Sequence, residues 1–292
     1  MPDTARPVTG ATRVAAVIGS PVLHSLSPVL LNAAFSATGL DWVYAAFEVP
    51  DGRGAAAIGA MRTLGLGGLS VTMPHKVAAH DAVDVRTPVA DALGAVNCVF
   101  WDGDRLAGDN TDGPGLVDAL AHDPGIEVAG RRCVLVGAGG AGRAVARALG
   151  EAGAAEVVVV NRSPAPAARA AELAGPAGRV GTAADVPVAD LVVNATPLGM
   201  GDRGDRAGAA LPVEAAALRA GQVVVDLVYH PAETPLLAAA RAAGATAVNG
   251  VGMLVHQAGR AFSRWTGREA PIAAMTASVA SELARAPSDG DP

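Results

Sequence analysis

Apolar runs of β-branched residues, chiefly valine, alternate with alanine-rich stretches along nearly the whole chain. Strands that alternate with helices are joined by crossover connections, and this order favours parallel strands in an α/β fold. The pattern occurs twice, and a chain of 292 residues suits two domains of ordinary size. The sequence therefore predicts an α/β protein of two domains with mostly parallel sheets.

The first half is expected to contain parallel strands with helices between them. The strands are predicted at 14–18, 43–49 and 69–72, and the helices at 28–38 and 53–64. The Asp102-Gly103 pair separates two further short strands, 97–101 and 104–108, and such a pair is typical of a hairpin turn.

The second half begins with a strand at 133–136, followed by a glycine-rich loop and a helix over about 142–152. Further apolar runs predict strands at 157–160, 191–194, 223–227 and 246–248. The final stretch is predicted to be helical at 254–265 and 272–284, with no later strand to serve in the second domain.

The glycine-rich loop reads GAGGAG and matches the dinucleotide fingerprint. It stands where that motif functions, directly after an apolar strand and at the start of a helix, whose N–H groups attract a pyrophosphate. The spacing predicts a tight turn at the first glycine, close approach of the cofactor at the second and close helix packing at the third. A Rossmann-type, doubly wound domain is therefore predicted, with the whole run at the cofactor: Gly137, Ala138, Gly139, Gly140, Ala141 and Gly142.

The strand after this loop ends at Val160, where an NAD enzyme usually presents a carboxylate to the ribose hydroxyls. This chain has Asn161, Arg162 and Ser163 instead. A guanidinium and a hydroxyl suit a 2′-phosphate, which a carboxylate would repel. The predicted cofactor is therefore NADP(H).

Lys76 is the only lysine among 22 basic residues. Lysine can lose and regain a proton when its pKa is shifted, whereas the guanidinium of arginine effectively cannot. The segment from Ser70 to Lys76 runs from a strand end into a helix, and ligand sites of α/β folds form at such ends. Asn97 and Asp112 lie at other predicted strand ends, and a carboxylate beside Lys76 would hold and tune its ammonium group. Lys76 is a candidate acid/base.

Composition narrows the class of partner. The net charge of −6 and the scattered arginines predict no nucleic-acid surface, so a small-molecule partner fits better.

Cys98 and Cys133 lie in apolar runs without metal-ligand or disulfide spacing, which favours a reducing cytoplasm. The histidines, His75 among them, form no zinc-like pattern with carboxylates and are expected to be surface or supporting residues, so no metal is predicted. No stretch approaches the ~20 apolar residues of a membrane span.

At this point the residues resemble the shikimate dehydrogenase family. The matching motifs run from Ser25 to Gln257 in the family's order, and they are Ser25–Pro28, Thr72–Lys76, Gly94–Asn97, Asn110–Gly113, the GAGGAG loop, Asn161–Ser163, Asn194–Met200, Asp226–Tyr229 and Gly250–Gln257. The resemblance implies NADPH-dependent reduction of 3-dehydroshikimate to shikimate on the route to aromatic amino acids. It also implies that the chain returns to its first domain, which gives a substrate domain of 1–112 and 250–292 and a cofactor domain of 113–249.

The same resemblance implies roles for individual residues. Ser25 and Ser27 would bind the substrate carboxylate, although by themselves they could also cap a helix at Pro28. Lys76 and Asp112 would form the catalytic dyad and, with Asn97, hold the ring hydroxyls. Three further residues would donate hydrogen bonds around the ring: Thr72, Tyr229 and Gln257. Three more would complete the cofactor site: Thr196, Leu227 and Gly250.

Three positions depart from the family pattern: Ser70, Cys98 and His230. They leave open a quinate/shikimate dehydrogenase that uses NAD, although Arg162 and the small Ser27 argue against it, and a dehydrogenase of an amino-substituted shikimate. Two further alternatives are a non-catalytic NADP-binding sensor, which has no reason to keep Lys76, and a folate-type dehydrogenase, in which Gln257 has no evident place. The chain is expected to be a monomer or a homodimer.

Overall fold

The computed structural model describes residues 7–200 and 211–285, so both ends of the predicted substrate domain, 1–6 and 286–292, lie outside the described residues. Contacts divide the chain into two compact units. The first consists of Met1–Thr111 and Val255–Pro292, and the second is Asp112–Leu254. Since the final segment returns to the first unit, that unit is discontinuous in sequence.

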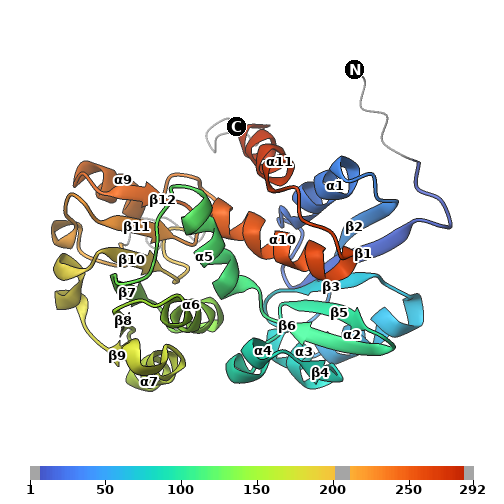
Figure 1. The fold of residues 1–292 in the computed structure, drawn as a ribbon, viewed down its shortest axis with the longest axis horizontal. Coiled ribbons are helices and arrows are strands. Elements are labelled where there is room, and N and C mark those ends of the chain that lie inside the picture. Colours follow the sequence, from blue (N-terminus) through green and yellow to red (C-terminus); the bar gives the residue numbers. More distant parts are fainter. Residues whose placement is uncertain (1–6, 201–210, 286–292) are drawn as a thin grey trace. The chain divides into compact units, whose positions relative to one another are not determined.

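The first unit contains a six-stranded sheet in the order β2-β1-β3-β5-β6-β4 (Figure 1). Its strands are β1 (Arg13–Gly19), β2 (Trp42–Glu48), β3 (Gly68–Val71), β4 (Val85–Arg86), β5 (Cys98–Asp102) and β6 (Arg105–Asp109). Strands β1, β2 and β3 are parallel, β4 is parallel to β6, and β5 is antiparallel to both β3 and β6. The carboxyl end of β3 and the amino end of β5 therefore lie at the same edge of the sheet.

Helices cover both faces of this sheet. They are α1 (Ser27–Ala37), α2 (Gly54–Leu64), α3 (Lys76–Ala82), α4 (Pro88–Leu93) and α11 (Ile272–Arg285), together with α10 (Val251–Thr266), which begins in the second unit. On one face Ile58 and Met61 of α2 join a buried cluster with Leu69 of β3. On the other face the rings of Phe35 in α1 and Phe262 in α10 lie 5.6 Å apart.

The second unit contains a six-stranded, all-parallel sheet in the order β12-β11-β10-β7-β8-β9. Its strands are β7 (Arg132–Val136), β8 (Glu156–Val160), β9 (Gly178–Val180), β10 (Leu191–Asn194), β11 (Val223–Asp226) and β12 (Thr246–Val248). The chain runs outward from β7 in one direction through β8 and then in the other through β10. The strand order thus reverses beside β7, where doubly wound folds bind their ligands.

Alternate residues of these strands point to opposite faces and enter separate cores. Leu135 of β7 belongs to one cluster with Leu120 and Leu149, whereas Val134 belongs to another with Leu236. The helices of this unit are α5 (Asp112–His122), α6 (Gly140–Glu151), α7 (Pro164–Leu173) and α9 (Pro235–Ala242), with 3₁₀ turns η1 (Gly175–Ala177), η2 (Ala183–Val188) and η3 (Ala215–Ala217). Because helices cover both faces of the sheet, its central strands are apolar over most of their length.

The predicted fold class, with a mostly parallel sheet and a Rossmann-type doubly wound domain, is confirmed. The predicted strands 191–194 and 246–248 have the observed bounds of β10 and β12. The pattern missed β4 and β9, because two or three partly exposed residues at a sheet edge carry no apolar run. The helix after the glycine loop begins at Gly140 rather than near Gly142.

We expect Gly142→Ala to destabilise the second unit. A Cβ at Gly142 would lie 2.1 Å from the carbonyl oxygen of Gly137, so the backbone must move. Overpacking of this kind costs about 1–3 kcal/mol and would disturb the loop that precedes the helix. Thermal melts should show a lower Tm, and NADPH titration should show weaker binding.

The matched control is Gly59→Ala in helix α2, where nothing lies within 4 Å of an added Cβ. It should leave NADPH binding unchanged and raise the Tm slightly, because alanine is the better helix former. An unchanged Tm and unchanged NADPH binding in Gly142→Ala would contradict the close packing of this loop.

Candidate active site

The glycine loop lies between the carboxyl end of β7 and the amino end of α6. Gly137 has φ +103°, a conformation that L side chains rarely adopt, and its N–H donates to the Val160 carbonyl at 2.9 Å. Gly139 has no heavy atom within 4 Å of an added Cβ, so it presents open backbone. The loop thus combines a fixed turn with an open stretch at a helix N-terminus, which fits a pyrophosphate.

Asn161, which follows β8, ties that strand end to the loop. Its Oδ1 accepts from the Ala138 N–H at 3.2 Å, and its Nδ2 donates to the Ser163 carbonyl at 3.0 Å. Arg162 and Ser163 are exposed, and the Ser163 side chain makes no capping hydrogen bond to α7. The structure therefore places an exposed guanidinium and hydroxyl, and no carboxylate, directly after β8.

The other residues expected at the cofactor follow β10, β11 and β12. The Thr196 hydroxyl donates to Asn194 Oδ1 at 2.7 Å. A Cβ at Gly250 would lie 2.2 Å from the Leu227 carbonyl oxygen, so only glycine lets these two loops approach so closely. Because all strands of this sheet are parallel, these loops lie at the same edge as the GAGGAG run.

Tyr229 lies on the loop after β11 and is partly buried. Desolvation raises the pKa of its phenol above the ordinary value, so the hydroxyl stays protonated at neutral pH. A protonated phenol can donate a hydrogen bond to a substrate oxygen.

In the first unit, Lys76 is the first residue of α3. The Thr72 N–H donates to the Ile18 carbonyl at 2.9 Å, and the Lys76 carbonyl accepts from the Val96 N–H at 2.9 Å. The neighbouring His75 is only 2% exposed, and its Nε2 lies 2.8 Å from the Val49 carbonyl oxygen. Since a carbonyl can only accept, Nε2 carries the hydrogen, and His75 anchors the segment that presents Lys76.

Asn97 and Thr111 hold one another in the buried edge of this sheet. Asn97 Oδ1 accepts from the Thr111 N–H at 2.8 Å, and its Nδ2 donates to Thr111 Oγ1 at 3.0 Å. Asn97 immediately precedes β5 and does not begin the strand as predicted. Asp112 follows Thr111 as the first residue of α5 and is 7% exposed.

Asp109, which the sequence reasoning missed, anchors the same segment. Its carboxylate accepts from Thr87 Oγ1 at 2.6 Å, from the Asn110 N–H at 2.8 Å and from Arg264 Nη2 at 2.9 Å. The ion pair joins the segment before Asp112 to helix α10, across 155 positions of sequence. The sequence did contain a signal for this role, because Asp109 is an acidic residue at a strand end directly before the Asn110–Gly113 motif.

Helix α1 begins at Ser27, one residue before the predicted start at Pro28. The N-cap is Leu26, so neither Ser25 nor Ser27 takes the alternative role of N-cap. Ser25 Oγ instead accepts from the Ser27 N–H at 3.2 Å, which forms a local turn before the helix. Gln257 lies on α10 and is partly buried.

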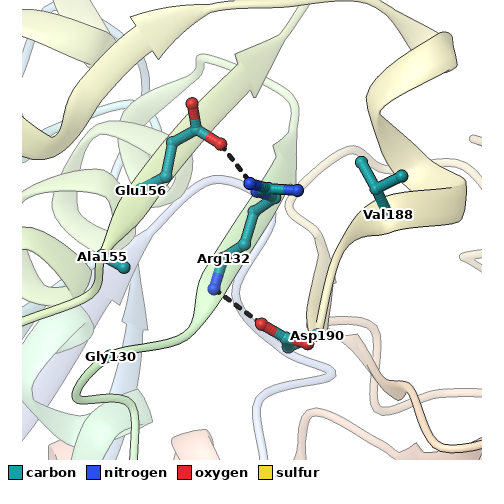
Figure 2. Close-up of a pocket in the computed structure, with 6 residues that line it drawn as sticks. All are labelled: Gly130, Arg132, Ala155, Glu156, Val188 and Asp190. Atoms are coloured by element: carbon teal, nitrogen blue, oxygen red, sulfur yellow. Dashed lines mark hydrogen bonds and ion pairs between the residues drawn. The ribbon is translucent and has the colours of Figure 1, made fainter.

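A polar hollow lies at the opposite edge of the second sheet, where its strands begin (Figure 2). Arg132 Nε lies 3.0 Å from a Glu156 carboxylate oxygen, and the Arg132 N–H donates to Asp190 at 2.9 Å. Arg179 pairs with both Glu156 and Asp185 at 2.6 Å. These charges satisfy one another, and the hollow lies away from the glycine loop, so it is an ion-pair cluster rather than part of the cofactor site.

Cys98 and Cys133 are free and buried, and burial raises the pKa of Cys133 to about 12 and that of Cys98 further. Neither thiol can serve as a thiolate at neutral pH. Over 7–200 and 211–285, no group of three or more His, Cys, Asp or Glu side chains could hold a metal. In the same parts of the chain, no helix has the length and apolar character of a membrane span.

A Rossmann-type unit with a glycine loop, joined to a second α/β unit with a lysine after a strand end, defines the class of pyridine-nucleotide-dependent dehydrogenases. Three family models match segments of this chain. They describe a shikimate dehydrogenase substrate binding domain over residues 17–99, a shikimate/quinate 5-dehydrogenase over 119–196 and a shikimate 5′-dehydrogenase C-terminal domain over 250–280.

Known proteins agree with these models. An NADP(+) shikimate dehydrogenase of Moorella thermoacetica is 45% identical over 281 residues, which cover 92% of each chain. The Thermus thermophilus shikimate 5-dehydrogenase, solved with NADP(H) and shikimate, is similar with a TM-score of 0.85 and 37% identity over 92% of this chain and 99% of its own. The chain therefore belongs to the shikimate dehydrogenase family, and the resemblance inferred from the motifs is confirmed.

One solved structure of similar fold has another activity. The 5-ketofructose reductase of a Gluconobacter strain is similar with a TM-score of 0.83 and 31% identity, over 94% of this chain and all of its own. The fold alone thus does not determine which carbonyl compound is reduced.

The ion-pair cluster at the strand beginnings predicts a pH-dependent effect of Glu156→Gln. The hydrogen bond from Arg179 holds the pKa of Glu156 below its usual range, against the effect of desolvation. A depressed carboxyl pKa contributes stability above the unfolded pKa of about 4.3, and this is lost as the pH falls through the folded pKa.

Because Glu156 is only partly buried and its arginine partners are partly exposed, solvent screens the ion pairs and the change should be small. We expect the Tm of Glu156→Gln to be lower by about 1–3 °C at pH 7 and equal to that of the wild type near pH 3. The KM for NADPH should not change. A Tm difference that grows toward acidic pH, or a raised KM for NADPH, would contradict this assignment.

Proposed function

We propose that this protein catalyses the reversible, NADPH-dependent reduction of 3-dehydroshikimate to shikimate in the biosynthesis of chorismate and the aromatic amino acids. The observation that carries the proposal is family membership over both units, combined with the position of the only lysine of the chain, which begins α3 after the short segment that follows β3. Most of the proposed substrate contacts lie in the first unit, with Asp112 and Tyr229 in the second, and all proposed cofactor contacts lie in the second unit.

Lys76 and Asp112 are the proposed acid/base pair. Delivery of hydride to a carbonyl leaves an alkoxide, which requires a proton and stabilisation of its charge. An ammonium group can supply both, and a carboxylate keeps it charged and oriented. The anchors of each partner support this role, since His75 fixes the segment of Lys76, and Asp109 fixes the segment that leads to Asp112.

The remaining substrate contacts follow from hydrogen-bonding capacity. Ser25 and Ser27 would bind the substrate carboxylate through their hydroxyls and the start of α1. Asn97 would hold ring hydroxyls in the orientation that Thr111 fixes. Three further side chains complete the set: Thr72, Tyr229 and Gln257.

The second unit has groups that fit NADPH, which supplies the hydride when bound. The open backbone at Gly139 would accept the pyrophosphate, and Arg162 and Ser163 would bind the 2′-phosphate. Asn161 would act mainly by holding the loop, because both ends of its amide already bond to backbone. Thr196, Leu227 and Gly250 line the same edge of the sheet.

The second candidate function is a dehydrogenase that acts on a substrate related to shikimate. The Gluconobacter 5-ketofructose reductase has a similar fold, and Ser70, Cys98 and His230 differ from the family pattern. Steady-state assays with shikimate, quinate and an aminoshikimate against NADP and NAD separate these activities. We expect the highest kcat/KM for shikimate with NADP, and a higher value for another pair would overturn the proposal.

Lys76→Ala should abolish turnover while NADPH binding and folding persist. Lys76→Arg is the matched control, since it keeps the positive charge but cannot exchange a proton. We expect both variants to retain less than about 1% of kcat, with shikimate binding better preserved in Lys76→Arg. Retention of more than a few per cent of kcat by either variant would refute the acid/base role.

Arg162→Asp should lower kcat/KM for NADPH far more than for NADH, because the carboxylate repels the 2′-phosphate. Loss of a charged hydrogen bond and the new repulsion together predict a change in the NADPH to NADH ratio of about 100-fold or more. Arg169→Asp on helix α7 serves as a control for general surface charge. Equal losses with both cofactors would exclude the 2′-phosphate role.

Cellular location and oligomeric state complete the proposal. A location in the cytoplasm is supported by the two free, buried thiols. Either a monomer or a homodimer is compatible with this proposal, and light scattering of the purified protein distinguishes them.

A further inference from the structure

Asp226 is the last residue of β11 and is completely buried. Its carboxylate accepts from Asn194 Nδ2 at 2.9 Å, from the Val228 N–H at 3.1 Å and from Thr234 Oγ1 at 2.7 Å. All three donors are uncharged. Desolvation raises the pKa of Asp226, while these hydrogen bonds oppose the rise. A carboxylate in such a place is costly unless its hydrogen bonds are complete, so the arrangement is strongly determined.

The hydrogen bond from Asn194 to Asp226 fixes the loop after β10. Asn194 is also completely buried, and its Nδ2 is directed to Asp226. This orientation leaves Asn194 Oδ1 to accept from both the N–H and the hydroxyl of Thr196, at 3.0 and 2.7 Å. Thr196 Oγ1 in turn accepts from the Leu198 N–H at 3.3 Å. The chain of hydrogen bonds thus runs from Asp226 through Asn194 into the loop of Thr196.

The hydrogen bonds from Val228 and Thr234 to Asp226 fix the loop after β11. Asp226 receives hydrogen bonds from Val228 and Thr234, which lie on either side of Tyr229. Thr234 also caps helix α9, since its hydroxyl accepts from the Leu237 N–H. Both ends of the segment that contains Tyr229 are therefore attached to the same carboxylate.

We propose that Asp226 is a positioning residue that holds the Thr196 loop and the Tyr229 segment in one joint arrangement. The inference rests on the proposed function, in which Thr196 serves the cofactor and Tyr229 the substrate. A carboxylate suits the task because its two oxygens accept every one of these bonds and present no competing donor. Loss of Asp226 should therefore weaken cofactor and substrate recognition together.

Gln222 provides a matched control at the other end of the same strand. It precedes β11 at the opposite edge of the sheet and is likewise completely buried. Its Nε2 donates to the carbonyls of Val186 and Ala189 at 2.8 and 3.1 Å, and its Oε1 accepts from the Arg219 N–H at 2.9 Å. Gln222 thus matches Asp226 in burial and in number of hydrogen bonds but attaches segments away from the glycine loop.

The experiment compares Asp226→Ala with Gln222→Ala in the full chain. Both should lower the Tm. At a temperature where both are folded by circular dichroism, Asp226→Ala should weaken NADPH binding about tenfold or more, by fluorescence titration, and raise the KM for shikimate. Gln222→Ala should change either constant by less than about twofold. This difference separates positioning from a purely structural role.

Asp226→Asn tests whether geometry is the cause. The amide oxygen can keep the bonds from Asn194 and Val228, and its Nδ2 can donate to Thr234 Oγ1. We expect NADPH affinity and the KM for shikimate within about threefold of the wild type. Thr234→Val removes the bond to Asp226 together with the N-cap bond from the Leu237 N–H. It covers the case in which Asp226→Ala does not fold, and it should shift both constants by about two- to threefold.

Two outcomes would overturn the proposal: unchanged NADPH affinity and KM in the folded variants, or equal losses in Asp226→Ala and Gln222→Ala. The titration does not depend on turnover. If the wild type binds NADPH but does not oxidise shikimate, the substrate assignment fails, whereas the effect of Asp226 on NADPH affinity is still measured. The two failures are therefore distinguishable.

Discussion

Burial of parallel strands along their whole length is the constraint on which the rest of this structure depends. Strands β10 and β11 are apolar and buried up to their polar last residues, and β7 is apolar and buried after its exposed first residue, Arg132. Polar side chains such as Asn194 and Asp226 can therefore lie only where these strands end, and there they must satisfy their hydrogen bonds. The parallel arrangement places the carboxyl ends of all these strands at one edge of the sheet. The groups that fit a dinucleotide therefore lie close together because of strand direction, and no charge pattern along the sequence is needed to bring them there.

The first unit follows the same rule with one variation. Its strand β5 is antiparallel to β3, so the amino end of β5 joins the edge at which β3 ends. Asn97 reaches the edge in this way, and Lys76 lies there because it begins α3 shortly after β3 ends. The pair Asp109 and Arg264 then attaches the returning helix α10 to the segment before Asp112. A short network thus fixes the segment that leads to Asp112, one member of the proposed acid/base pair.

Sequence reasoning located residues whose chemistry stands out from their surroundings. Lys76 is conspicuous because arginine replaces lysine everywhere else in the chain, and the GAGGAG run because it follows an apolar strand. It did not find the hydrogen-bond partners of His75, Asp109 and Asp226, because these partners are distant in sequence. Asp109 and Arg264 are separated by 155 positions, and Asp226 and Asn194 by 32. The short strands β4 and β9 escaped for a related reason, since their pairing rather than their composition makes them strands.

By itself the sequence determined the fold class, most strands and the order of the site motifs, because alternation of apolar residues and glycine spacing are local properties. Only the tertiary structure decided which polar side chains satisfy one another. It showed that Leu26 rather than a serine occupies the N-cap of α1, and that Asn161 holds the glycine loop. Hydrogen-bond partners are chosen by distance in space, and a single sequence carries no record of that distance.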